Sequence, residues 1–106
     1  MQESRFRISS KDGFNQIITK RLTGELACII LKSDNKIEVN IDSEEGYNLL
    51  CLKDVAGIQY LAIKTNSVDF NGHVYEMPSN YFLNEKLIIS VNGGKNLEVE
   101  VLLRFG

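Results

Sequence analysis

Residues 97–105 read Leu97-Glu98-Val99-Glu100-Val101-Leu102-Leu103-Arg104-Phe105, and this stretch decides the fold class. Apolar and charged side chains alternate along its first part, as they do in a β-strand that buries one face and exposes the other. The turn residues Asn92-Gly93-Gly94-Lys95 separate it from a second apolar run at 86–91. The C-terminal part of the chain therefore predicts two strands joined as a hairpin.

Other segments of the chain show strand patterns between turn signals. The dipeptide Asn71-Gly72 is the strongest short hairpin signal, because both central residues of a type I′ turn need positive φ. Pro78 ends the pair around it, because proline lacks a backbone donor. The expected strand pairs are 25–32 with 36–42, 47–53 with 58–64, and 68–70 with 73–77, and residues 5–8 form a strand that enters a turn at 11–13.

Residues 14–22 fit two kinds of secondary structure. Phe14, Ile17, Ile18, Arg21 and Leu22 follow the spacing of an amphipathic helix. The segment 17–19 is a run of β-branched residues, which favours a strand. We expect a strand here, with one short helix near residues 14–22 as the alternative.

The composition agrees with a single all-β domain. A chain of 106 residues has room for one core. Ile and Val together number 18, which favours strands, whereas ten Asn against three Ala is a poor composition for helices. We predict that residues 1–106 form one antiparallel β-sandwich, jelly-roll-like, of about 8–10 strands.

The charges are nearly balanced, with 12 Lys and Arg against 14 Asp and Glu, and both signs are spread along the chain. This balance argues against a broad nucleic-acid footprint and against a polybasic membrane patch. Residues 1–7 are polar, and the longest apolar stretch, 26–31, is far shorter than the roughly 18 residues that span a bilayer. We expect a protein made in a reducing cytoplasm, with no signal peptide.

The residues that could carry metal or catalytic chemistry are few. Cys28 and Cys51 lie within apolar runs, so we expect buried thiols, with a disulfide between them as the alternative. His73 is the single histidine, which excludes a metal site built on two histidines and any triad that does not use it. Carboxylates at 42–46 indicate a solvated turn, with a calcium loop as the alternative. We therefore expect no metal, no cofactor and no enzymatic activity.

Polar and aromatic residues gather between residues 66 and 82. Such a set can bind a sugar, because Asn and Asp grip hydroxyl groups and Tyr stacks under a ring. It can equally be a protein contact or ordinary turns, and the absence of Trp weakens the sugar-binding interpretation. The candidate ligand-binding residues are Asn66, Asp69, Asn71, His73 and Tyr75.

Leu102 and Leu103 break the alternation of the last strand. If Leu103 points into the core with its alternate neighbours, Leu102 points outward beside Arg104 and is a candidate contact between subunits. A bulge that turns Leu102 inward is the alternative. Tyr81 and Phe82 are further interface candidates, because aromatic residues are favoured at interface cores.

The whole-chain pattern, which is nearly all strand, lacks Trp and closes with the segments 86–91 and 97–105, resembles the small jelly-roll or β-sandwich virion proteins of tailed phages. The resemblance rests on no diagnostic motif. It implies a structural protein that decorates the head or forms part of a fibre or tail, commonly as a trimer, with capsid or tail proteins as partners. We therefore expect a self-associating structural protein, with a carbohydrate-binding module that uses residues 66–82 as the alternative.

Overall fold

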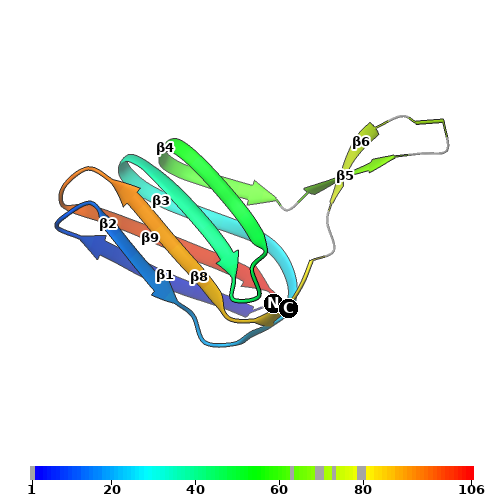
Figure 1. Cartoon of the computed structure of the whole chain (residues 1–106), viewed down its shortest axis with the longest axis horizontal. Coiled ribbons are helices and arrows are strands. Elements are labelled where there is room, and N and C mark those ends of the chain that lie inside the picture. Colours follow the sequence, from blue (N-terminus) through cyan, green and yellow to red (C-terminus); the bar gives the residue numbers. More distant parts are fainter. Residues whose placement is uncertain (1, 63, 69–70, 73, 79–80) are drawn as a thin grey trace.

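The computed structural model describes the backbone of residues 2–62, 64–68, 71–72, 74–78 and 81–106, and the side chains of residues 2–59, 71–72 and 81–106. The described strands are β1 Gln2–Ser10, β2 Phe14–Ile18, β3 Leu22–Ser43, β4 Asn48–Ala62, β5 Lys64–Val68, β6 Val74–Pro78, β7 Phe82–Glu85, β8 Leu87–Gly93 and β9 Leu97–Phe105 (Figure 1). All of their pairings are antiparallel. The all-β prediction is confirmed, and residues 14–18 form the expected strand instead of the alternative helix.

The longest strands, β3 and β4, pair with each other and bend together. The bend lies where Ser33 faces Gly57 and Ile37 faces Val55, with register shifts on either side of Ile37. On β4, Asp54 and Gly57 take positive φ, 55° and 77°. On β3, the hydroxyl of Ser33 donates to the carbonyl of Asn35 at 2.8 Å. The bend places the two halves of each strand in different layers.

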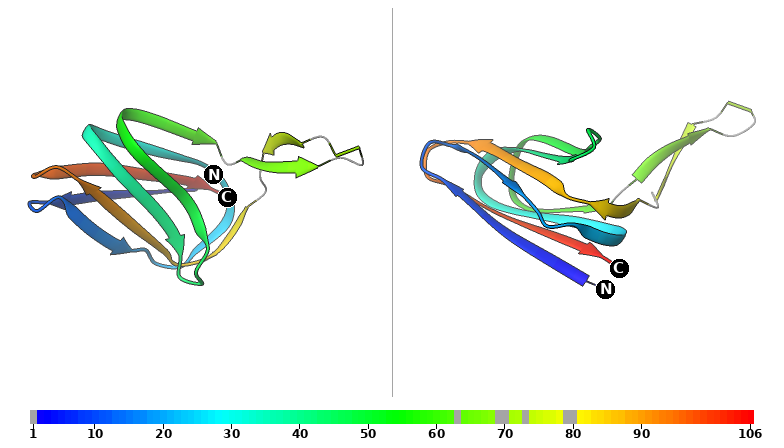
Figure 2. Two further views of the ribbon diagram at one scale, coloured as in Figure 1. Left: turned by 45° about the horizontal axis from the view of Figure 1, so that its top comes forward. Right: turned by 60° about the horizontal axis from the view of Figure 1, so that its bottom comes forward.

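Two layers of four antiparallel strands result from this bend. The β9 layer has the order β1, β9, residues 26–33 of β3, and residues 57–62 of β4. The β8 layer has the order β2, β8, residues 37–43 of β3, and residues 48–55 of β4. The bends of β3 and β4 and the turns that follow β1 and β8 lie at one end of the molecule, the bend end, and each of them carries the chain from one layer to the other (Figure 2). This is the arrangement of a jelly roll, and the sheet is nearly closed into a barrel.

The turns at the bend end support one another through backbone contacts. Gly13, between β1 and β2, has a φ of 94°, and its carbonyl accepts a bond from the amide of Gly93 at 2.8 Å. A Cβ on Gly13 would lie 2.5 Å from the carbonyl oxygen of Gly93. The position therefore requires glycine both for its backbone conformation and for this close approach.

One apolar core fills the space between the layers. The alternating residues of β9 and of the two halves of β3 point into it, together with residues of β1, β7 and β8. Its least exposed side chains include Ile29, Leu31, Ile41, Ile89 and Leu103. Because both layers contribute to one cluster, neither can bury its apolar face alone.

The seam between the edge strands β1 and β2 is bridged by one side chain. Asn15 donates from Nδ2 to the carbonyl of Ser9 on β1 at 2.9 Å, and its Oδ1 accepts from the amide of Gln16 at 2.8 Å. Edge strands expose unpaired backbone groups. Asn15 satisfies one such group on each side of the seam.

Three predicted strand pairings are wrong, although the strands exist. Segments 25–32 and 36–42 do not form a hairpin, because they are the two halves of the bent strand β3. Segments 47–53 and 58–64 likewise belong mainly to the bent strand β4. Strands β8 and β9 follow each other in sequence but do not pair, since each pairs with a different half of β3.

A strand pair around Asn71-Gly72 is confirmed, although its described strands are 64–68 and 74–78, and the predicted positions 69, 70 and 73 lie outside the described residues. Strands β5 and β6 form a separate two-stranded sheet in which Val68 pairs with Val74 and Lys64 with Pro78 (Figure 1). Gly72 takes a φ of 82°. Strand β7 follows the β5–β6 hairpin in the chain and pairs with residues 22–25 of β3.

Candidate functional site

The outer face of the β9 layer carries three rows of side chains that run across the strands. In the Glu100 row, Arg7 of β1, Glu100 of β9 and Lys32 of β3 are register partners. This row continues to Ile58 on β4. The Leu102 row contains Arg5, Leu102 and Ile30, and the Arg104 row contains Glu3, Arg104 and Cys28. We call these three rows the charged face.

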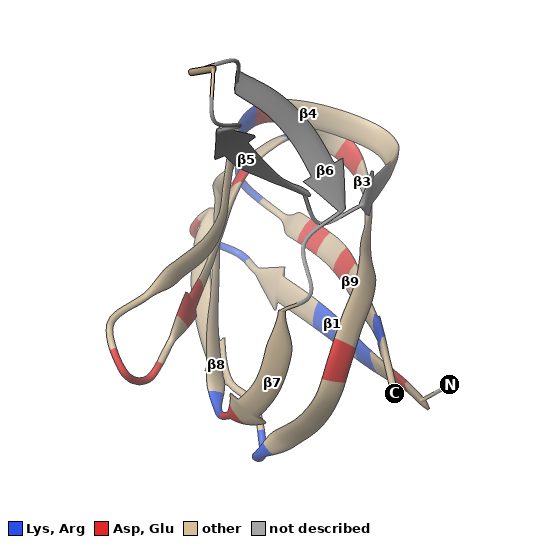
Figure 3. Cartoon of the chain, turned by 90° about the vertical axis from the view of Figure 1, so that its right-hand side faces the viewer, with Lys and Arg blue, Asp and Glu red and all other residues tan. Residues whose placement is uncertain are grey.

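Ion pairs link the charges of this face within the chain. The Nε atoms of Arg5 and Arg7 lie 3.3 and 3.7 Å from the two carboxylate oxygens of Glu100. The Nε of Arg104 donates to Oε1 of Glu3 at 2.8 Å. Figure 3 shows the acidic bands of β9 beside the basic bands of β1. Exposed ion pairs of this kind contribute at most about 1 kcal/mol each, so their partners can be exchanged at little cost.

Leu102 faces outward, which is the first of the two orientations that the sequence allowed; the other was an inward turn at a bulge. The register of β9 with β1 is continuous from residue 97 to residue 105, so no bulge turns Leu102 into the core. The side chain is nevertheless only 8% exposed. The prediction placed Leu102 on the correct face but did not foresee that the side chains around it would cover it.

A hollow of about 480 Å³ lies at the bend end of this face. It continues the Glu100 row toward the turns and has both charged and apolar walls. Its lining residues are Arg7, Lys32, Ser33, Asp34, Gly57, Ile58, Glu98, Val99 and Glu100.

A polar network holds the opposite end of the molecule together. The carboxylate of Glu85 is buried and accepts two hydroxyl hydrogen bonds, at Oε1 from Tyr81 at 2.9 Å and at Oε2 from Ser43. Burial, the hydrogen bond to Glu85 and the negative charge of that carboxylate raise the pKa of Tyr81 to about 12. The network joins the end of β3 to β7, and it occupies the hydroxyl of Tyr81, one of the interface candidates.

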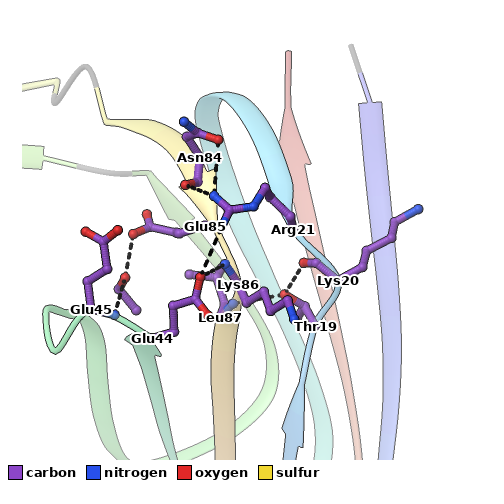
Figure 4. A network of polar contacts seen from close by, with 10 residues as sticks. Thr19, Lys20, Arg21, Glu44, Glu45, Asn84, Glu85, Lys86 and Leu87 are labelled. Carbon is purple, nitrogen blue, oxygen red and sulfur yellow. Dashed lines mark hydrogen bonds and ion pairs between the residues drawn. The ribbon is translucent and has the colours of Figure 1, made fainter.

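Charged side chains extend this network toward β2 (Figure 4). Arg21 donates to the carbonyl of Asn84 at 2.8 Å and lies 3.6 Å from the carboxylate of Glu44. The same carboxylate accepts from the amide of Lys86 at 3.3 Å. These contacts fix the turns around β7, and they assign Glu44 of the acidic turn a structural role. Among the side chains the structure describes, no three His, Cys, Asp or Glu residues gather as a metal site.

Among the described side chains, five large apolar ones are more than half exposed: four occur at the sheet edges, and Tyr47, at 63%, lies in the turn between β3 and β4. Phe14 and Ile18 on β2, Ile58 on β4 and Phe82 on β7 are 56%, 66%, 66% and 68% exposed. Within the described pairings, each of these three strands pairs with only one neighbour. Of the interface candidates, Phe82 is therefore exposed as predicted. The sequence prediction missed Phe14, Ile18 and Ile58, although Phe14 and Ile18 stand four residues apart and must share one face of an expected strand.

The candidate ligand-binding residues lie in or near the β5–β6 hairpin. Asn66 and Tyr75 occupy positions on β5 and β6, with side chains outside the described part. Asn71 is exposed in the turn. Asp69 and His73 lie outside the described residues, so their role as ligands stays a prediction.

The two cysteines differ in their surroundings. Cys28 is buried, as predicted, but Cys51 is exposed. The prediction for Cys51 was wrong because its neighbours on β4, Leu50 and Leu52, alternate inward and leave Cys51 on the outer face opposite Asn40. The two thiols are not joined in a disulfide.

In the part of the chain that the structure describes, no helix has the length and apolarity to cross a membrane. A scan against models of known protein families finds no match to this chain, and a search of curated proteins finds no similar sequence.

Proposed function

We propose that this chain is a non-enzymatic structural protein that self-associates through the edges of its jelly roll. One observation carries the proposal: among the described side chains, four of the five large apolar residues that are more than half exposed lie on strands with an open edge, β2, β4 and β7. Among the described side chains, the central strands β3, β8 and β9 expose no large apolar residue to a comparable extent. Apolar groups beside unpaired backbone groups favour contact with another chain.

The mass of the full chain in solution tests this proposal. Sedimentation velocity across micromolar concentrations is expected to show a closed homo-oligomer, for which the virion resemblance implies a trimer. A plain monomer at every concentration, with no binding to a larger assembly, would refute it.

Matched variants on β2 test whether an edge carries the contact. Ile18→Thr removes an exposed apolar side chain, whereas Gln16→Thr changes an exposed polar side chain of the same strand face. We expect Ile18→Thr to weaken assembly at least several-fold and Gln16→Thr to leave it unchanged. Equal effects of the two variants would count against a contact at this edge.

The biological setting that we propose rests on the resemblance to the small virion proteins of tailed phages. We propose that the assembly is a virion component, which decorates a capsid or belongs to a fibre. Neighbouring genes for capsid and tail proteins would support this role. Neighbouring genes for polysaccharide degradation, together with a positive glycan array, would instead support the carbohydrate-binding alternative at residues 66–82.

A further inference from the structure

The charged face is complementary to a copy of itself that is turned about an axis across the strands. Along β1 it carries Arg7 in the Glu100 row and Glu3 in the Arg104 row. Along β9 the order of signs is reversed, with Glu100 in the first of these rows and Arg104 in the other. The row between them has two apolar side chains, Leu102 and Ile30, at its centre.

We propose that a second copy of this chain stacks on the charged face about a twofold axis that runs along the Leu102 row. This inference rests on the proposed self-association and names one contact that contributes to it. The rotation keeps each strand over its own counterpart and exchanges the two outer rows. It therefore places Arg7 over Glu3 of the second copy and Glu100 over Arg104 of the second copy.

The opposite choice of axis is unfavourable. A rotation about an axis along β9 would place Arg7 over Lys32 of the second copy and Glu100 over its own counterpart, so that like charges meet. Like charges placed together at an interface cost several kcal/mol and exclude the wrong orientation. The order of charges thus favours the axis along the Leu102 row over an axis along β9.

The charged side chains needed for this contact are at least partly accessible, with Glu100 26% and Arg104 36% exposed, whereas Leu102 at the centre is 8% exposed. The side chains of Arg7 and Glu3 are 74% and 48% exposed. Arg5 would meet its own counterpart at the rim, and this like-charge contact is reduced by Glu100 of the same chain, which lies 3.3 Å from Arg5 and also pairs with Arg7. Ile58, which is exposed beside Lys32, adds apolar surface at the other rim.

A twofold contact of this kind joins two copies of the oligomer that forms through the sheet edges. Alone it gives a dimer, and two trimers joined through it give a closed hexamer. Loss of the contact therefore halves the mass of the assembly in either case.

Charge reversal tests the proposed pairing. Arg7→Glu places a carboxylate over Glu3 of the second copy, and Glu3→Arg places a guanidinium over Arg7 of the second copy. We expect each variant alone to show half the wild-type mass in sedimentation velocity and about a tenfold or larger increase in the dissociation constant.

Combining the reversals restores the opposite charges. An equimolar mixture of the two single variants is expected to form a mixed assembly of full mass, because each face then meets a complementary one. The double variant Arg7→Glu with Glu3→Arg is expected to assemble at least as tightly as the wild type. Within its own chain, the double variant places a carboxylate beside Glu100 and a guanidinium beside Arg104. If the single variants lost mass only because they fold poorly, the double variant would therefore lose more mass than either of them.

The outcomes separate this inference from the proposed function. A monomeric wild type overturns both. A wild-type oligomer whose mass neither single variant changes overturns the twofold contact and leaves self-association through the edges in place. Loss of mass in the single variants without recovery in the mixture also overturns the contact. Matching circular dichroism spectra and urea midpoints confirm that the variants are folded.

Discussion

Replacing Tyr81 by Phe removes the one hydroxyl that links Oε1 of the buried Glu85 to the rest of the network. The hydrogen bond is 2.9 Å long and its acceptor is a carboxylate. Bonds of this type contribute about 1.5–3 kcal/mol. Because Tyr81 is only half-buried, we expect the lower end, about 1.5 kcal/mol at neutral pH. With a urea m value of about 1.5 kcal/mol/M, the unfolding midpoint falls by about 1 M.

The same substitution has a characteristic pH dependence. The pKa of Tyr81 is raised from 10.0 to about 12 in the folded chain. The folded state therefore keeps this proton at a pH where the unfolded state has released it. The stabilisation is fully present below pH 10 and is lost as the pH rises toward 12. Tyr81→Phe lacks this group, so the stability difference from the wild type is constant below pH 10 and shrinks above it.

Urea unfolding followed by circular dichroism, at neutral pH and at several values from about 9 to 12, measures both effects. Tyr47→Phe is the matched control, because the Tyr47 side chain is 63% exposed in the turn between β3 and β4. We expect this control to unfold with the wild type at neutral pH. An unchanged midpoint for Tyr81→Phe, or a difference from the wild type that does not vary with pH, would refute the role assigned to the hydroxyl.

Three further outcomes follow from the packing and the turns. Gly13→Ala introduces a Cβ 2.5 Å from the carbonyl oxygen of Gly93 and is expected to lower the thermal midpoint more than Gly46→Ala, which has a similar φ but an open surrounding. Leu103→Ala in the core is expected to cost about 2–5 kcal/mol in urea unfolding, and a cost below about 1 kcal/mol would contradict its burial. Cys51 is expected to react with a thiol reagent in the native protein and Cys28 only after unfolding, and mass spectrometry of the labelled peptides distinguishes the two.

Alternation predicted which segments are strands, but it did not predict their partners. The signals at Ser33-Asp34-Asn35 and at 54–57 look the same whether a strand reverses or only bends. In the fold these two signals face each other, and β3 and β4 bend together without reversing. The separation of β8 from β9 has the same origin, because each strand pairs with a different half of β3. Pairing is decided by the whole sheet, and a local pattern does not contain that information.

The face of a residue was easier to predict than its exposure. The period of two allowed Leu102 to point outward beside Arg104, with an inward bulge as the alternative, and the register agrees with the outward placement. Its exposure of only 8% depends on neighbouring strands that are distant in sequence, such as β1, where Arg5 is its register partner. The network of Tyr81, Ser43 and Glu85 could not be predicted either. Ser43 lies 42 residues before Glu85 in the sequence, and only the fold brings its hydroxyl to this carboxylate.

Strand β3 pairs with β4, β7, β8 and β9, and its two halves belong to both layers. Detachment of either layer therefore disrupts the strand on which the other layer depends. We expect amide hydrogens along β3, β8 and β9 to exchange with solvent at one common slow rate, through a single cooperative opening. Most of these contacts join residues far apart in sequence, so the chain must close long loops before any of them forms, and refolding is expected to take milliseconds to seconds.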